Sequence, residues 1–122
     1  MRDSISAART GEMRQNADGS RVFEFQFPAD DPTFAGHFPG RPILPGVFQL
    51  EMVHVVAEAA LNCPLAVREI RKAKFQRPIL PGVAVRVELK LSEKDGTIEA
   101  RAGFSVAGQT AGETTLLLWR CE

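Results

Sequence analysis

Residues 47–61 read VFQLEMVHVVAEAAL, and this stretch decides the fold. It lacks Gly and Pro and is apolar around most of its circumference, which is typical of a helix buried on several sides. Glu51, His54 and Glu58 fall at i, i+3 and i+7, so the helix places them on roughly one face. That face must therefore meet either solvent or a site of chemistry.

Short segments of strand-like sequence flank the helix. Each either alternates apolar and polar residues or carries an apolar run of strand length. They are residues 21–27, 67–77, 85–91, 98–106 and 116–119. In the second segment, Ile70 and Phe75 are the expected apolar anchors. One buried helix beside about five antiparallel strands predicts an α+β fold in which the helix lies across a curved sheet.

Composition limits the classes of protein that the chain can represent. Its 122 residues, 44% of them hydrophobic, predict one domain over residues 1–122, with residues 1–20 less regular than the rest. Fifteen basic and fifteen acidic side chains cancel, which argues against nucleic-acid and membrane partners. No stretch resembles a signal peptide or approaches the ~18 apolar residues of a spanning helix, so we expect a soluble, cytoplasmic protein. Cys63 and Cys121 fit no metal-binding spacing, and no metal is expected.

A loop rich in Gly and Pro leads into the helix. Residues 36–46 read GHFPGRPILPG, a composition that excludes regular structure. His37 lies in this loop, and Glu51 lies on the first turns of a helix that otherwise avoids charge. Because a partly desolvated carboxyl favours its protonated form, His37 and Glu51 can act as a base and an acid. Such a pair suits removal of a proton next to a carbonyl combined with loss of a β-hydroxyl.

The start of the helix offers a place for the negative charge that this reaction develops on the carbonyl oxygen. The turn Pro45-Gly46-Val47 supplies unpaired backbone N–H groups and the positive end of the helix dipole. Gly46 has no side chain, so a substrate can approach the backbone closely. Taken alone, His37 and Glu51 also have simpler interpretations, namely a structural hydrogen bond and a solvent-exposed carboxylate.

Two blocks of the sequence resemble the 3-hydroxyacyl-[acyl-carrier-protein] dehydratases of fatty acid synthesis. The first is residues 33–51, TFAGHFPGRPILPGVFQLE, which is similar to the active-site segment of that family and keeps its His-to-Glu spacing. The second is residues 72–82, KAKFQRPILPG, which is similar to a later strand and turn. The resemblance covers about residues 21–121. The sequence of residues 48–51 is more similar to accessory dehydratases of polyene or polyketide-like clusters than to the housekeeping enzyme.

The resemblance implies a hotdog fold, in which a curved antiparallel sheet wraps a central helix, and a homodimer or higher homo-oligomer with active sites at the subunit interface. It implies that His37 of one subunit removes the C2 proton of a (3R)-3-hydroxyacyl thioester and that Glu51 of the other protonates the leaving hydroxyl, which gives a trans-2-enoyl thioester. The Gly46 N–H would hold the thioester carbonyl. The substrate would arrive on the phosphopantetheine arm of acyl carrier protein, so no cofactor is required. The expected substrate contacts are Phe38, Pro45, Gly46 and Val47.

Val55 departs from the family, because many members carry a Gln one helical turn after the acidic residue. Two other functions stay open. A hotdog acyl-thioesterase would use Glu51 or His37 to activate water on the same acyl group. A non-catalytic acyl-binding subunit is the other, and the Val55 departure favours it.

Positive charge is concentrated in ten residues of this neutral chain, 68–77. One interpretation is a solvated strand face. The resemblance implies the other, which is a docking surface for the acidic helices of acyl carrier protein. The expected docking residues are Arg71, Lys72, Lys74 and Arg77.

Overall fold

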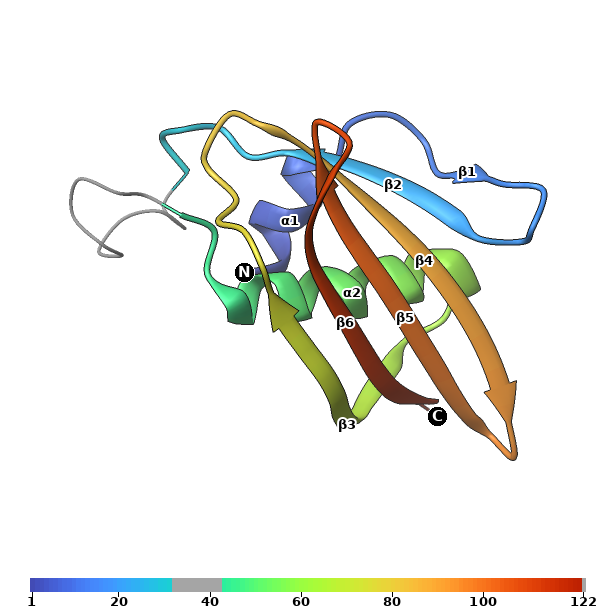
Figure 1. Ribbon diagram of the computed structural model, residues 1–122. Helices are drawn as coiled ribbons and strands as arrows, with labels where there is room; N and C mark the ends of the chain where they lie inside the picture. The colour runs from blue at the N-terminus through green and yellow to red at the C-terminus, as the bar shows by residue number, and fades with distance from the viewer. Residues whose placement is uncertain (32–42, 122) are drawn as a thin grey trace.

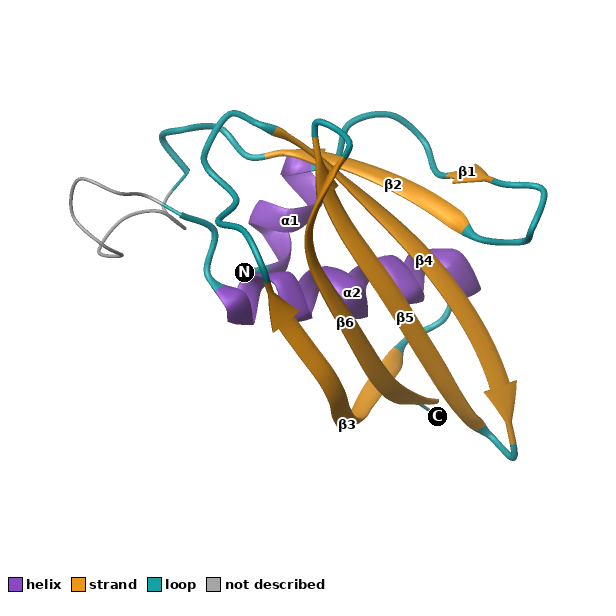
Figure 2. Ribbon diagram, viewed as in Figure 1, coloured by secondary structure: helices purple, strands orange, loops and turns teal. Residues whose placement is uncertain are grey.

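A computed structural model describes residues 1–31 and 43–121 of the chain. In this part of the chain, one antiparallel sheet curves around a central helix (Figure 1). The helices are α1 (Arg2–Ala8) and α2 (Gly46–Leu61). The strands are β1 (Arg14–Gln15), β2 (Arg21–Gln26), β3 (Leu65–Phe75), β4 (Ala84–Lys94), β5 (Thr97–Val106) and β6 (Gln109–Arg120). The strand order is β1-β2-β4-β5-β6-β3, and both helices lie on the concave side of the sheet (Figure 2).

The core lies between α2 and the concave face of the sheet. Alternate residues of the strands point inward, and β5 shows the pattern clearly, because Ile98, Ala100 and Phe104 are buried. From the helix, Met52 and Val56 fill the space opposite them. Full burial of side chains of this size contributes about 1.5–3 kcal/mol each, so this contact is the main stabilising feature of the fold.

The ends of α2 follow from local sequence. Pro45 is the N-cap residue and makes no side-chain capping hydrogen bond, and its carbonyl oxygen accepts from the Phe48 and Gln49 N–H groups. At the other end, Asn62 has a left-handed conformation with φ of 53°, which Asn tolerates better than most residues. The predicted helix is confirmed, and β2 to β5 agree with the predicted segments apart from their ends. In contrast, β6 begins well before the predicted segment 116–119, and β1 was not predicted.

The N-terminal segment differs from the expectation of a less regular stretch. Residues 2–8 form the helix α1, because Ile5 and Ala8 reach the hydrophobic core and are 0% and 2% exposed. Two apolar positions in seven residues are too few to predict a helix from the sequence. The helix α1 nevertheless packs on the core and places Arg2 beside Glu51 and Glu58 of α2.

The expectation for strand β3 was wrong in one respect. Ile70 and Phe75 were expected to be buried anchors, but they are 52% and 48% exposed. The reason is that β3 is an edge strand, paired only with β6, and most of its residues project beyond the area that α2 covers. Within the described residues, neither helix is both long enough and apolar enough to cross a membrane.

Candidate active site

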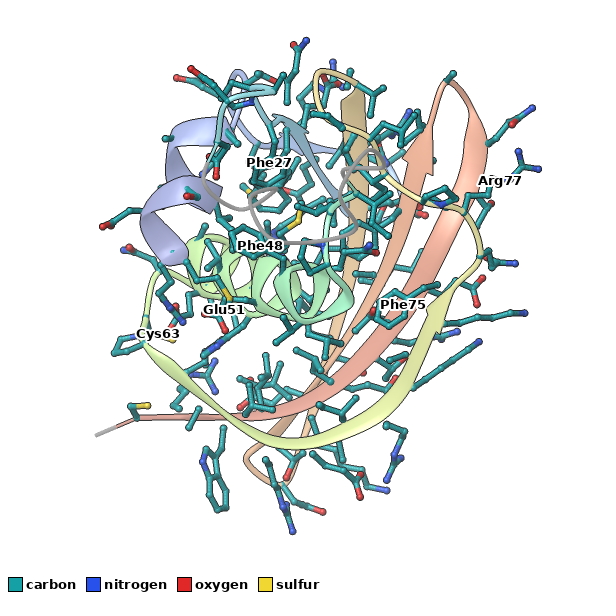
Figure 3. All side chains as sticks on the ribbon, turned by 90° about the vertical axis from the view of Figure 1, so that its left-hand side faces the viewer. Phe27, Phe48, Glu51, Cys63, Phe75 and Arg77 are labelled. Carbon is teal, nitrogen blue, oxygen red and sulfur yellow. The ribbon has the colours of Figure 1, made fainter. Side chains whose placement is uncertain are left out.

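The polar face of α2 holds the acidic residue predicted to be catalytic. Glu51 Oε1 lies 3.5 Å from His54 Nδ1, and His54 Nε2 lies 3.7 Å from Glu58 Oε2. All three side chains are partly buried, with exposed fractions of 25%, 14% and 18%. The prediction that they share one face is therefore confirmed, and Figure 3 shows Glu51 on the side of α2 that turns away from Phe75.

Arg2 of α1 covers this face with its guanidinium group. Its Nε lies 2.8 Å from Glu51 Oε1, and its Nη1 donates a hydrogen bond to Glu58 Oε1. Its Nη2 lies 3.1 Å from His54 Nδ1. All three nitrogens are therefore engaged. The sequence analysis did not identify Arg2, because a partner 49 positions before Glu51 becomes visible only when α1 is placed on α2.

The same face is tied to the first residue of β3. His54 Nε2 lies 2.6 Å from the Leu65 carbonyl oxygen, and the Leu65 N–H donates to Glu58 Oε2 at 2.8 Å. Burial alone would raise the pKa of Glu58, but the hydrogen bonds from Leu65 and Arg2 outweigh burial and lower it. In turn, the hydrogen bond to Glu58 is the main reason that the pKa of Arg2 is raised. Polar groups from α1, α2 and β3 thus meet in one cluster.

The expected substrate-binding turn lies at the start of α2. Val47 is 59% exposed, and Pro45 and Gly46 are partly exposed, so a ligand can reach this turn. Gly46 also has a packing role that the sequence did not reveal. A Cβ atom at this position would lie 2.8 Å from the ring of Phe75, so the half-exposed ring would have to shift if residue 46 carried a side chain. Phe75 is therefore a further residue of this turn.

Gln49 is a second residue that the sequence analysis did not single out. It is 3% exposed, so this polar side chain lies inside the fold. Its Nε2 donates to the Leu44 carbonyl at 3.4 Å, while its Oε1 has no hydrogen-bond partner among the described residues. Gly112 of β6 lies beside it, and a Cβ there would meet the Lys74 carbonyl oxygen at 2.7 Å.

Two of the predicted site residues, His37 and Phe38, lie outside the described residues. The structure therefore places Glu51, Pro45, Gly46 and Val47 and leaves the predicted base untested. Val55, where many family members carry Gln, packs partly buried against the hydrophobic core.

The predicted docking residues are all exposed, but ion pairs reduce their free charge. Arg71 Nε lies 3.3 Å from Glu69 Oε2, and Lys72 Nζ lies 2.8 Å from Glu113 Oε2. Arg77 donates a hydrogen bond to the side chain of Gln109. Lys74 has no ion pair among the described residues. Lys74 still lies across from Glu113 in the β3–β6 pair and, with Lys72, lowers the pKa of that carboxyl.

The arrangement first defines a structural class. A curved antiparallel sheet that wraps one central helix is a hotdog fold, as the resemblance implied. The structure titled "The Dehydratase Heterocomplex ApeI:P from Xenorhabdus doucetiae" superposes with a TM-score of 0.75 at 28% identity, over 89% of this chain and 95% of that one. An uncharacterized protein from Erwinia carotovora subsp. atroseptica superposes with a TM-score of 0.73 at 26% identity, over 93% of this chain and 95% of that one.

Sequence comparison then gives the family. The ApeI-like family, described as ApeI dehydratase, matches residues 12–113, so the chain belongs to the ApeI-like dehydratase family. A relative from Pelotomaculum thermopropionicum is 37% identical over 97 residues, which cover 73% of this chain and 69% of the relative. One from Desulforamulus reducens is 36% identical over 109 residues, covering 82% and 77%. Both are named 3-hydroxyacyl-[acyl-carrier-protein] dehydratase FabZ, and the predicted enzyme class, a dehydratase, is confirmed.

Proposed function

We propose that this chain removes water from (3R)-3-hydroxyacyl thioesters on acyl carrier protein and forms trans-2-enoyl thioesters. The observation that carries the proposal is Glu51, a partly exposed carboxyl on the central helix in a member of a dehydratase family. The relatives named FabZ support the substrate class. A carrier-linked substrate also favours a cytoplasmic location.

In the proposed reaction, His37 takes the proton from C2 of the acyl chain. The electrons of the broken C2–H bond form the C2=C3 double bond, and the C3–O bond breaks with its electron pair on oxygen. That oxygen takes the proton of Glu51 and leaves as water. The proton on His37 afterwards replaces the one that Glu51 has given, so the enzyme returns to its starting state. None of these steps requires a metal or a cofactor.

The turn at the start of α2 is proposed to hold the thioester carbonyl. Gly46 and Val47 are the first residues of the helix, and their N–H groups have no acceptor four residues earlier within the helix. Negative charge that develops on the carbonyl oxygen is stabilised there by the N–H groups and by the helix dipole. Val47 is largely exposed, which leaves room for an acyl group beside the turn.

Product analysis tests the proposed reaction against the thioesterase alternative. Purified protein is incubated with 3-hydroxyacyl groups of several lengths on acyl carrier protein, and the carrier is analysed by mass spectrometry. A dehydratase gives a carrier that has lost one water and no free thiol, whereas a thioesterase gives free acid and free thiol. Glu51→Gln is expected to lower the rate about 10²–10⁴-fold, which is typical for loss of a general acid. Unchanged activity in Glu51→Gln would favour a different site.

We also propose that the working unit is a homodimer formed along β3. Among the described residues, this strand pairs only with β6 and has no strand partner at its other edge, and Val67, Ile70 and Phe75 are 43–52% exposed. Unpaired edges with apolar side chains are places where a second copy pairs. The Glu51 face is tied to the start of β3 and the Gly46 turn to its end, so a partner along this edge would lie beside both. The similar structure from Xenorhabdus doucetiae is a dehydratase heterocomplex, so the alternative partner is a related second chain.

The docking surface for acyl carrier protein is proposed to be the basic end of β3 and the turn after it. Lys74 and Arg77 supply positive charge there, and both are exposed. Lys74 precedes and Arg77 follows Phe75, the last residue of β3, which lies against Gly46, so a carrier bound there would deliver its arm close to the start of α2. Attraction of this kind raises the association rate and weakens with salt.

A further inference from the structure

We infer that Arg2 is a positioning residue for the dehydration, because it holds one oxygen of the Glu51 carboxyl and leaves the other free to face the substrate. The inference rests on the proposed role of Glu51 as the acid. It adds a residue from α1, a helix that no part of the sequence analysis connected with the site.

The two oxygens of Glu51 have different surroundings. Arg2 Nε lies 2.8 Å from Oε1, and His54 Nδ1 lies 3.5 Å from the same atom. Oε2 has no hydrogen bond or ion pair within the described part of the chain. A carboxyl held by one oxygen presents the other in a fixed direction, which is what proton transfer to a leaving hydroxyl requires.

Arg2 can act in this way because its own orientation is fixed by two further partners. Its Nη1 donates to Glu58 Oε1 and its Nη2 lies 3.1 Å from His54 Nδ1, so the planar guanidinium has a contact for each nitrogen. The short distance between His54 Nε2 and the Leu65 carbonyl assigns the ring proton to Nε2. Arg2 Nη2 also lies 3.3 Å from Nε2, so the guanidinium packs against the imidazole ring and contacts both of its nitrogens.

The position of Arg2 is fixed by the packing of helix α1 on the core. Helix α1 is anchored in the core by Ile5 and Ala8, which brings residue 2 to the Glu51 face in a fixed register. The Arg2 side chain is 47% exposed, so replacing it removes the contacts to Glu51 without opening the core. Loss of function in such a variant would therefore report on the site and not on folding.

The geometry also predicts which step Arg2 favours. When Glu51 gives its proton to the leaving oxygen, it becomes a carboxylate, and a guanidinium on Oε1 stabilises that charge as it forms. Arg2 therefore lowers the free-energy barrier to breaking the C3–O bond and does not strengthen binding of the acyl chain. Removal of Arg2 should therefore lower kcat and leave KM nearly unchanged.

The test compares Arg2→Gln, Arg2→Lys and the control Arg14→Gln, which removes another N-terminal arginine whose ion pair is with Glu24. We expect kcat to fall about 10- to 100-fold in Arg2→Gln, with partial recovery in Arg2→Lys, and to stay unchanged in the control. Circular dichroism and melting temperature show whether each variant is folded. Equal kcat in Arg2→Gln and the control would overturn the inference.

A double variant separates this inference from the proposed function on which it rests. If Arg2 acts through Glu51, then Arg2→Gln added to Glu51→Gln causes no further loss of kcat. A full second loss in the double variant would show that Arg2 acts elsewhere and would overturn the inference. Wild-type activity of Glu51→Gln alone would overturn the role of Glu51 as acid, and the role of Arg2 with it.

Discussion

The ring of Phe75 lies where a side chain on residue 46 would have to be: a Cβ there would stand 2.8 Å from Phe75 Cε2. The Phe75 ring at the end of β3 thus packs against Gly46, the first residue of α2. This contact links the unpaired edge of the sheet to the turn proposed to hold the thioester carbonyl.

Gly46→Ala should therefore be destabilising, by about 1–2 kcal/mol, because overpacking forces the Phe75 ring or the start of α2 to move. The free energy of unfolding is measured by denaturant titration at one protein concentration. Adding Phe75→Ala should cancel much of the penalty, so the two changes are non-additive. Additivity within about 0.5 kcal/mol would mean that the contact has no energetic weight.

Glu58 gives the fold a pH-dependent contribution. Its folded pKa lies below the ordinary value of 4.5, so its contribution to stability is complete above that value and is lost as pH falls through the folded pKa. The gap in unfolding free energy between wild type and Glu58→Gln should accordingly be larger at neutral pH than in acid. Glu12→Gln, which changes an exposed glutamate outside the cluster, is the control and should show no comparable change. A gap that stays constant with pH would contradict the assigned role of Glu58.

The proposed dimer along β3 predicts that a charge on this edge strand changes the oligomeric state. Ile70→Lys places a charge on an exposed apolar position of the edge strand and should shift the protein to monomers, because like charges would meet across the interface. Ser92→Lys, on an exposed position of β4, should leave the assembly intact. Sedimentation velocity measures both, and activity should fall with the dimer fraction. A fully active monomeric Ile70→Lys variant would be incompatible with a shared active site.

The proposed docking surface predicts a defect that depends on how the substrate is delivered. Lys74→Glu should lower kcat/KM for substrates on acyl carrier protein about 10-fold, since charge reversal slows an electrostatically steered association. The same variant should act normally on a short pantetheine thioester, which does not use that surface. Lys94→Glu, at the distant β4–β5 turn, is the control (Figure 1). Equal losses on both kinds of substrate would place Lys74 in the site and not on a docking surface.

Much of this fold was predictable because its patterns are local. The apolar circumference of residues 47–61 predicted α2, and alternation in β4 and β5 predicted strands with one buried face. The face shared by Glu51, His54 and Glu58 also followed from helical spacing alone.

What could not be predicted depends on contacts between distant parts of the chain. Arg2 meets Glu51 only because Ile5 and Ala8 of a seven-residue helix reach the core. The exposure of Ile70 follows from the place of β3 at the sheet edge, which strand alternation does not reveal. Gly46 was predicted to bind substrate, which stays a prediction, but its packing against Phe75 could not be predicted before the end of β3 was placed on α2.

The central claim is that His37 of one subunit works with Glu51 of the other, and a mixed dimer tests it most directly. His37→Ala and Glu51→Gln chains carrying different affinity tags are co-expressed, and the hybrid dimer is purified through both tags. The hybrid contains one site with both residues intact and one with neither, so it should show about half of the wild-type dehydratase activity per dimer. Both parent homodimers should be nearly inactive. A hybrid no more active than either parent would contradict a site shared between subunits.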